Sequence, residues 1–74
     1  MQKLIKKLKK EFLDGIGKPE EDITEADTND IKRFASEKCR SDQKIKKAFD
    51  RGPDGIPAYD NLYDDLADEF KLRQ

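Results

Sequence analysis

The sequence contains no histidine, which removes the side chain that enzymes use most often as a general acid or base. Only one cysteine is present, so the chain cannot form an internal disulfide, and the usual Cys and His ligand set for zinc is missing. A glycine-rich loop of the kind that cradles phosphate is also missing. We therefore predict that the chain is not an enzyme and that it has no catalytic residues, no cofactor and no metal site.

Valine is absent and threonine occurs only twice, which argues against a β-sheet because strands favour β-branched residues. No apolar segment approaches the roughly 20 residues needed to cross a bilayer. Lysines interrupt the N-terminal leucines, where a signal peptide would need an apolar core. With a single cysteine and no such signal, we expect a cytoplasmic location.

The chain has 74 residues, of which 34% are hydrophobic and 45% are charged. This length predicts a single helical domain over residues 1–74. The apolar residues are few but recur at regular spacings, whereas disordered segments are poor in them throughout. A core of this size leaves both a monomer and a homodimer open.

Charges of opposite sign alternate along the chain in four blocks. Residues 1–13 carry a net charge of +4 and residues 14–30 a net charge of −6. Residues 31–51 carry +5 and residues 52–74 carry −4, so the overall charge of −1 conceals a strongly patterned surface. Such a pattern informs about partners and orientation rather than about fold.

Apolar residues fall on one side of a helical wheel in four successive segments. The predicted fold is therefore all-α, a compact bundle of four short amphipathic helices over about residues 2–14, 25–39, 42–51 and 57–71. In the first helix Met1 belongs to the apolar stripe. The segment Gly52-Pro-Asp-Gly55 is a strong turn signal between the last two helices.

Several residues are predicted to begin or end these helices. Gly15 is expected to follow the first helix in a left-handed conformation. Thr24 is expected to cap the second helix, with a start at Thr28 as the alternative, and Ser41 is the candidate cap of the third. Pro57 suits the first turn of the fourth helix.

The fourth helix has an apolar stripe on one side and a row of acids on the other. The stripe, about 140° wide on an ideal wheel, consists of Tyr59, Leu62, Tyr63, Leu66, Ala67 and Phe70. The acids, a candidate surface for a basic protein partner, are Asp60, Asp64, Asp65, Asp68 and Glu69. Both tyrosines begin tetrapeptides that resemble signalling motifs, but their position in the stripe favours packing in the core.

Two isolated features have a simpler structural explanation than a chemical one. Cys39 lies on the apolar stripe of the second helix and lacks a base, so we interpret it as a core thiol. The segment from Asp50 to Gly55 resembles the start of a calcium-binding loop, but Asn61 stands where a bidentate glutamate is needed. A turn between two helices explains the same residues.

Nucleic-acid binding has the most specific claim among the alternatives. The second and third helices, joined by a turn near residues 39–41, are compatible with a helix-turn-helix. The candidate basic surface, for nucleic acid or an acidic partner, consists of Arg40, Gln43, Lys44, Lys46, Lys47 and Arg51. Against this interpretation, the fourth helix is acidic and the pI is 5.4.

These observations favour a small non-catalytic interaction protein, such as a regulator, adaptor, inhibitor or immunity-type protein, that binds another protein through charged helix faces. Nucleic-acid binding by the second and third helices is the first alternative. Peripheral membrane binding by the basic first helix is the second. It is disfavoured because that helix lacks tryptophan and needs its apolar side for the core.

Overall fold

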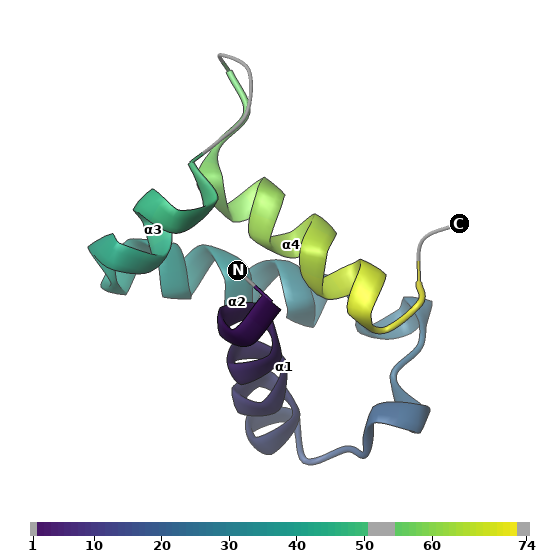
Figure 1. Cartoon of the computed structure of the whole chain (residues 1–74). Coiled ribbons are helices and arrows are strands. Elements are labelled where there is room, and N and C mark those ends of the chain that lie inside the picture. Colours follow the sequence, from purple (N-terminus) through teal and green to yellow (C-terminus); the bar gives the residue numbers. More distant parts are fainter. Residues whose placement is uncertain (1, 51–54, 73–74) are drawn as a thin grey trace.

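The computed structural model describes residues 2–50 and 55–72 (Figure 1). Within these residues there are four α-helices, two short 3₁₀ turns and no strand, which confirms the predicted all-α fold. In chain order the elements are α1 (Gln2–Ile16), η1 (Glu20–Asp22), η2 (Glu25–Asp27), α2 (Thr28–Ser41), α3 (Gln43–Phe49) and α4 (Ala58–Glu69). The radius of gyration is 11.6 Å, close to the roughly 11 Å expected for a compact chain of this length.

Helix α1 continues two residues beyond its predicted end. Gly17, rather than Gly15, takes the left-handed conformation, with a φ of 73°. Its N–H donates to the carbonyl of Leu13 at 3.0 Å. The extra residues bring Ile16 against the core, which favours the later of the two glycines as the stop. Met1 lies outside the described residues.

The connection between α1 and α2 is organised around Asp27. Its carboxylate accepts the backbone N–H of Thr24 at 3.0 Å and the Nζ of Lys18 at 2.9 Å. The hydroxyl of Thr24 in turn accepts the N–H of Ala26 at 3.3 Å. Thr24 therefore caps the 3₁₀ turn η2 instead of α2, which starts at Thr28, the alternative that the sequence left open.

A single residue, Asp42, separates α2 from α3, and it replaces Ser41 as the cap of α3. Ser41 is the last residue of α2. The N–H of Asp42 donates to the carbonyl of Lys38 at 3.0 Å, and its carboxylate accepts the N–H groups of Lys44 at 2.9 Å and Ile45 at 3.4 Å. Asp42 thus ends one helix and begins the next, because aspartate is as good a cap as serine.

Both ends of α4 differ slightly from the prediction. Pro57 occupies the capping position with extended backbone (φ −70°, ψ 157°) and so precedes the first turn instead of belonging to it. The helix ends at Glu69 instead of at residue 71, where Lys71 has a positive φ of 58°. Gly55 has a φ of 93°, as a turn glycine does, while residues 52–54 of the predicted turn lie outside the described residues. The third helix ends at Phe49, short of its predicted end at residue 51.

The core is built from the apolar stripes of all four helices, and α2 lies against both α3 and α4 (Figure 1). Its buried members are Ile5, Leu8, Phe12, Ile23, Ile31, Ala35, Cys39, Ile45, Phe49, Ala58, Leu62, Leu66 and Phe70. Phe12 of α1 contacts Phe34 edge-to-face at 5.4 Å and Phe70 at 5.8 Å, measured between ring centroids. These rings join α1 to α2 and to the end of α4.

One residue of the predicted core is not in it. Tyr59 is 41% exposed, although the helical wheel placed it in the buried stripe of α4. Leu62 and Leu66 are fully covered, and Tyr63 is half-buried. Ala58, in the same turn of α4, is buried, so the wheel position of Tyr59 alone does not decide whether it is covered.

Candidate binding surface

The last turn of α2 and the outward side of α3 form a continuous run of polar and basic side chains. We call this the basic surface, and its members are Arg40, Gln43, Lys44, Lys46 and Lys47. All five are exposed because Ile45 and Phe49 take the inward side of α3 into the core. Among the described residues, none of the four cations has an ion-pair partner. Arg51, the sixth predicted member, lies outside the described residues.

Helix α1 extends this positive region across a small pocket of about 250 Å³. Lys7 of α1, Lys38 of α2 and Lys44 of α3 line it around an apolar floor of Leu8 and Ile45. Lys38 is paired with Glu11 at 3.5 Å, so the region is not uniformly cationic. The structure therefore brings cations from the first and third charge blocks to one side of the molecule.

The predicted acidic surface of α4 is more occupied by internal interactions. Glu69 pairs with Lys9 at 3.6 Å. Asp64 and Asp65 are half-buried and take part in interactions within the chain. Asp60 and Asp68 are exposed. A partner that approached this face would compete with contacts already formed inside the protein.

We call the corner where Glu69 at the end of α4 lies beside Glu20 of η1 the acidic end. The charged side chains there form ion pairs between different elements. Lys9 of α1 donates to Glu20 of η1 at 2.8 Å and lies 5.6 Å from the ring centroid of Phe70. Only 17% of the Lys9 side chain is exposed. The aliphatic part of this lysine covers the edge of the core, and its ammonium joins three segments of the chain.

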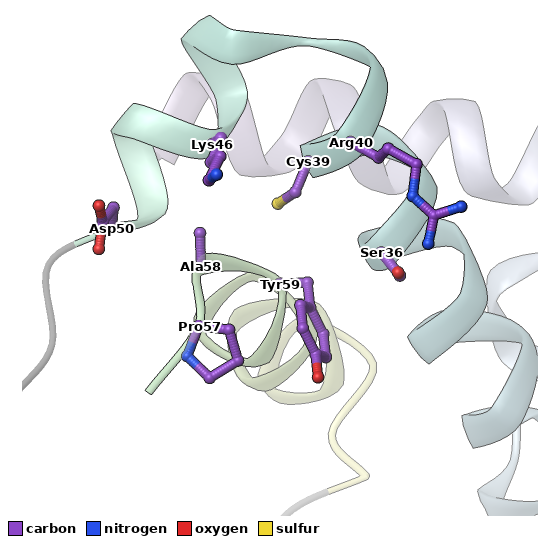
Figure 2. A pocket seen from close by; sticks show the side chains of 8 residues that line it. All are labelled: Ser36, Cys39, Arg40, Lys46, Asp50, Pro57, Ala58 and Tyr59. Carbon is purple, nitrogen blue, oxygen red and sulfur yellow. The ribbon is translucent and has the colours of Figure 1, made fainter. Parts of the chain in front are cut away.

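A second pocket, of about 400 Å³, opens where α2, α3 and α4 meet (Figure 2). We call it the three-helix pocket, and it is lined by Ser36, Cys39, Arg40, Lys46, Asp50, Pro57, Ala58 and Tyr59. Figure 2 shows Ser36 and Arg40 on one side and Lys46 and Asp50 on the other, with Pro57, Ala58 and Tyr59 below. Two members of the basic surface, Arg40 and Lys46, thus stand beside apolar and aromatic side chains.

Cys39 forms the buried floor of this pocket. Burial raises the pKa of its thiol, and the positive charge of Lys46 opposes part of that shift. A reactive cysteine needs a lowered pKa and an exposed position, and Cys39 has neither. Its interpretation as a core thiol is confirmed by its burial.

The turn that the sequence suggested for a helix-turn-helix does not lie at residues 39–41. Residues 39–41, the expected turn, are the last residues of α2. The connection is Asp42 alone, and α3 has only seven residues. The expected base and phosphate donors of α3 are nevertheless exposed together, as described above.

Within residues 2–50 and 55–72, no group of three His, Cys, Asp or Glu side chains is arranged to hold a metal ion. None of the helices in these residues is both long enough and apolar enough to span a membrane.

Comparison with known proteins gives no match: no family model fits the chain, and no curated protein or solved structure is similar enough to count as a relative. The surface itself is therefore the basis for a functional proposal.

Sequence reasoning identified the cations of α3 but missed the three-helix pocket. The pocket depends on how α4 crosses the junction of α2 and α3, which no single helical wheel contains. A partial signal was present in the sequence, because Tyr59 is the first residue of its stripe and follows Ile56 and Pro57 closely. Two large apolar residues beside a proline-containing turn mark a place where side chains are left uncovered.

Proposed function

We propose that this chain is a small non-catalytic binding protein of the cytoplasm that docks its basic surface on an acidic surface of another protein. The observation that carries the proposal is that Arg40, Lys44, Lys46 and Lys47 are all exposed and have no ion-pair partner among the described residues. Clustered cations without internal partners attract and orient an acidic partner, mainly by raising the association rate.

The contrast with α4 supports this choice of surface. An acidic partner would meet Lys44 and Lys47 without breaking an ion pair to another described residue. A basic partner on α4 would compete with Lys9 for Glu69. The acidic surface, which the sequence favoured for a protein partner, is therefore the weaker candidate of the two.

A second candidate function, nucleic-acid binding, is favoured by the distribution of cations around α3. At 100° per residue, Lys44 and Lys46 fall on opposite flanks of the helix, with Gln43 and Lys47 between them. Flanking cations can reach two phosphate backbones while a central amide faces base edges. The aspartates at both ends of α3, Asp42 and Asp50, oppose this arrangement by repelling phosphate.

The first test compares two anionic probes by fluorescence anisotropy, a labelled polyglutamate peptide of about 20 residues and a labelled DNA duplex of about 20 base pairs, at about 50 and 200 mM salt. We expect the peptide to bind, with an affinity that falls as salt rises. The double variant Lys44→Glu/Lys47→Glu should lose about tenfold or more in affinity, which corresponds to about 1.4 kcal/mol.

The control is Lys3→Glu/Lys10→Glu, which makes the same charge change on two exposed lysines of α1 that do not belong to the basic surface. This control should lose much less affinity. In both variants the free energy of unfolding should differ from that of the parent by no more than about 0.5 kcal/mol, as is usual for surface substitutions. Equal losses in the two variants would show a diffuse charge effect and contradict the proposal. Tight duplex binding with a steep salt dependence, together with weak peptide binding, would select nucleic acid instead.

A further inference from the structure

We propose that the three-helix pocket is the specificity site of this surface and holds an acidic segment of the protein partner that also presents an apolar side chain. In this arrangement a carboxylate of the segment meets Arg40, and the apolar side chain lies against Tyr59. The proposal rests on the proposed function above and specifies which chemistry the partner must bring.

Two large apolar side chains at the start of α4 and just before it are exposed to solvent. Tyr59 is 41% exposed and forms a wall of the pocket, and Ile56, which is 42% exposed, lies three residues before it in the chain. They are the two large hydrophobic side chains that are exposed among the described residues. Cys39 and Ala58 add a buried apolar floor. An exposed aromatic side chain at a concave site with a buried apolar floor is typical of a docking position.

Charged side chains around the same pocket favour a carboxylate on one side of it. Arg40 and Lys46 line it from opposite sides, while Asp50 is the one acid among the described residues that line it (Figure 2). Asp50 stands on the side of Lys46, away from Arg40 and Ser36, so it repels a carboxylate toward that opposite side. A guanidinium offers a planar pair of donors that matches a carboxylate, and the hydroxyl of Ser36 is a further donor beside it.

The form of the pocket favours a chain segment over a small free ligand. Small-molecule sites enclose most of their ligand, whereas the cations and Tyr59 at this rim are exposed to solvent. Lys44 and Lys47 lie on the same helix as Lys46, so a longer acidic segment that leaves the pocket meets further positive charge. A short stretch of alternating acidic and apolar residues satisfies both halves of the site.

The test is an NMR titration of the isotope-labelled chain with three blocked peptides of equal length. The first alternates Glu and Leu, the second has Ser in place of every Leu, and the third has Gln in place of every Glu. We expect the first peptide to shift the backbone amides of Cys39, Lys46, Ala58 and Tyr59 in a saturable way. It should bind about tenfold tighter than either of the others, because each of them lacks one half of the required chemistry.

Two variants and one control connect the binding to the pocket. Arg40→Gln and Tyr59→Ala should each weaken the first peptide about tenfold, whereas Lys7→Gln, which removes an exposed charge outside the pocket, should change its affinity by less than about twofold. Arg40 is exposed, so Arg40→Gln should not affect folding. This variant therefore still tests the pocket even if Tyr59→Ala destabilises the fold. Arg40→Gln should weaken the serine peptide much less than the leucine peptide, because the serine peptide has no apolar side chain to hold it at the pocket and Arg40 is then only one of the four cations that it can meet.

The possible results separate this inference from the proposed function. Equal affinities for the leucine and serine peptides, with shifts spread over the lysines of α1 and α3, would overturn the pocket and leave the basic surface as a general acidic-protein site. Failure of all three peptides while polyglutamate binds would have the same meaning. If polyglutamate also fails to bind, both proposals are wrong. A DNA duplex that shifts the same four amides more tightly than any peptide would show that the occupant is a nucleic acid.

Discussion

The acidic end and the basic surface both contain several charged side chains but use them in different ways. At the acidic end, Lys9 connects η1 to the end of α4. In the connection between α1 and α2, Lys18 pairs with Asp27, the residue before α2. On the basic surface the cations project from the last turn of α2 and from α3, with no ion pair to another described residue. Charge therefore holds segments together at one end and remains available for a partner at the other.

The size of the core side chains also differs between these two regions. Three phenylalanines, Phe12, Phe34 and Phe70, meet below the acidic end. The small side chains of Cys39 and Ala58 lie beneath the three-helix pocket. Large rings fill the space where ion pairs close the surface, whereas small side chains leave a hollow beside cations that have no ion pair to another described residue. The following three variants test this division, beginning with the largest expected effect.

Phe12→Ala should be the most damaging change, because it removes a buried ring that contacts two others. Such a substitution costs about 3–5 kcal/mol, which equals the whole net stability expected for a domain of this size, about 3–5 kcal/mol. We expect the variant to be largely unfolded at 25 °C by circular dichroism. Cys39→Ala, the matched change below the pocket, removes a single heavy atom and should cost only about 1 kcal/mol. Similar losses in the two variants would contradict the division of the core.

Asp27→Asn should destabilise the chain in a way that depends on pH. The N–H of Thr24 and then the ammonium of Lys18 hold the pKa of the Asp27 carboxyl below its ordinary value of 3.8. Its contribution to stability is therefore complete above pH 3.8 and disappears as the pH falls through the lower pKa of the folded state.

Urea unfolding of both proteins at neutral and acidic pH measures this contribution. The stability difference between the parent and Asp27→Asn should be largest near pH 7 and shrink in acid. Asp68→Asn serves as the control, since Asp68 is exposed on α4. A difference for Asp27→Asn that stays constant from neutral pH down to acid would show that the carboxylate charge does not hold the connection.

Lys9→Gln should give the smallest of the three effects, about 1 kcal/mol, from the loss of two ion pairs and of the contact with the Phe70 ring. Lys47→Gln removes the same charge from the basic surface, where it has no ion-pair partner among the described residues, and should change stability by less than about 0.5 kcal/mol. Thermal unfolding of the two variants side by side measures the contrast. An equal effect of both would remove the distinction between paired and available charge.

Much of this architecture was accessible from the sequence because each helix has its own apolar stripe. The number of helices and their approximate bounds followed from periodicity alone, as did the burial of Phe49 and Leu62 and the exposure of the lysines of α3. These features depend on one helix at a time. A burial pattern with a period of 3.6 residues is visible before any tertiary contact is known.

The errors occurred where two local solutions were equally good or where a neighbouring helix decides the outcome. Gly15 and Gly17 both suit a helix end, and Ser41 and Asp42 both suit a cap. The longer helix was formed in both cases, and it brings Ile16 of α1 against the core. Tyr59 belongs to the second kind of error, because only the position of α2 and α3 determines whether the first turn of α4 is covered.

The junction at Asp42 has a consequence for how quickly and how cleanly a partner would engage. The N–H and the carboxylate of this residue are already hydrogen-bonded to the two helices that it joins. Only Asp42 separates the helix of Arg40 from the helix of Lys44, so no flexible loop has to become ordered when a partner binds. A partner would meet a surface whose backbone shape is set before the encounter, and little backbone conformational entropy would be lost there on association.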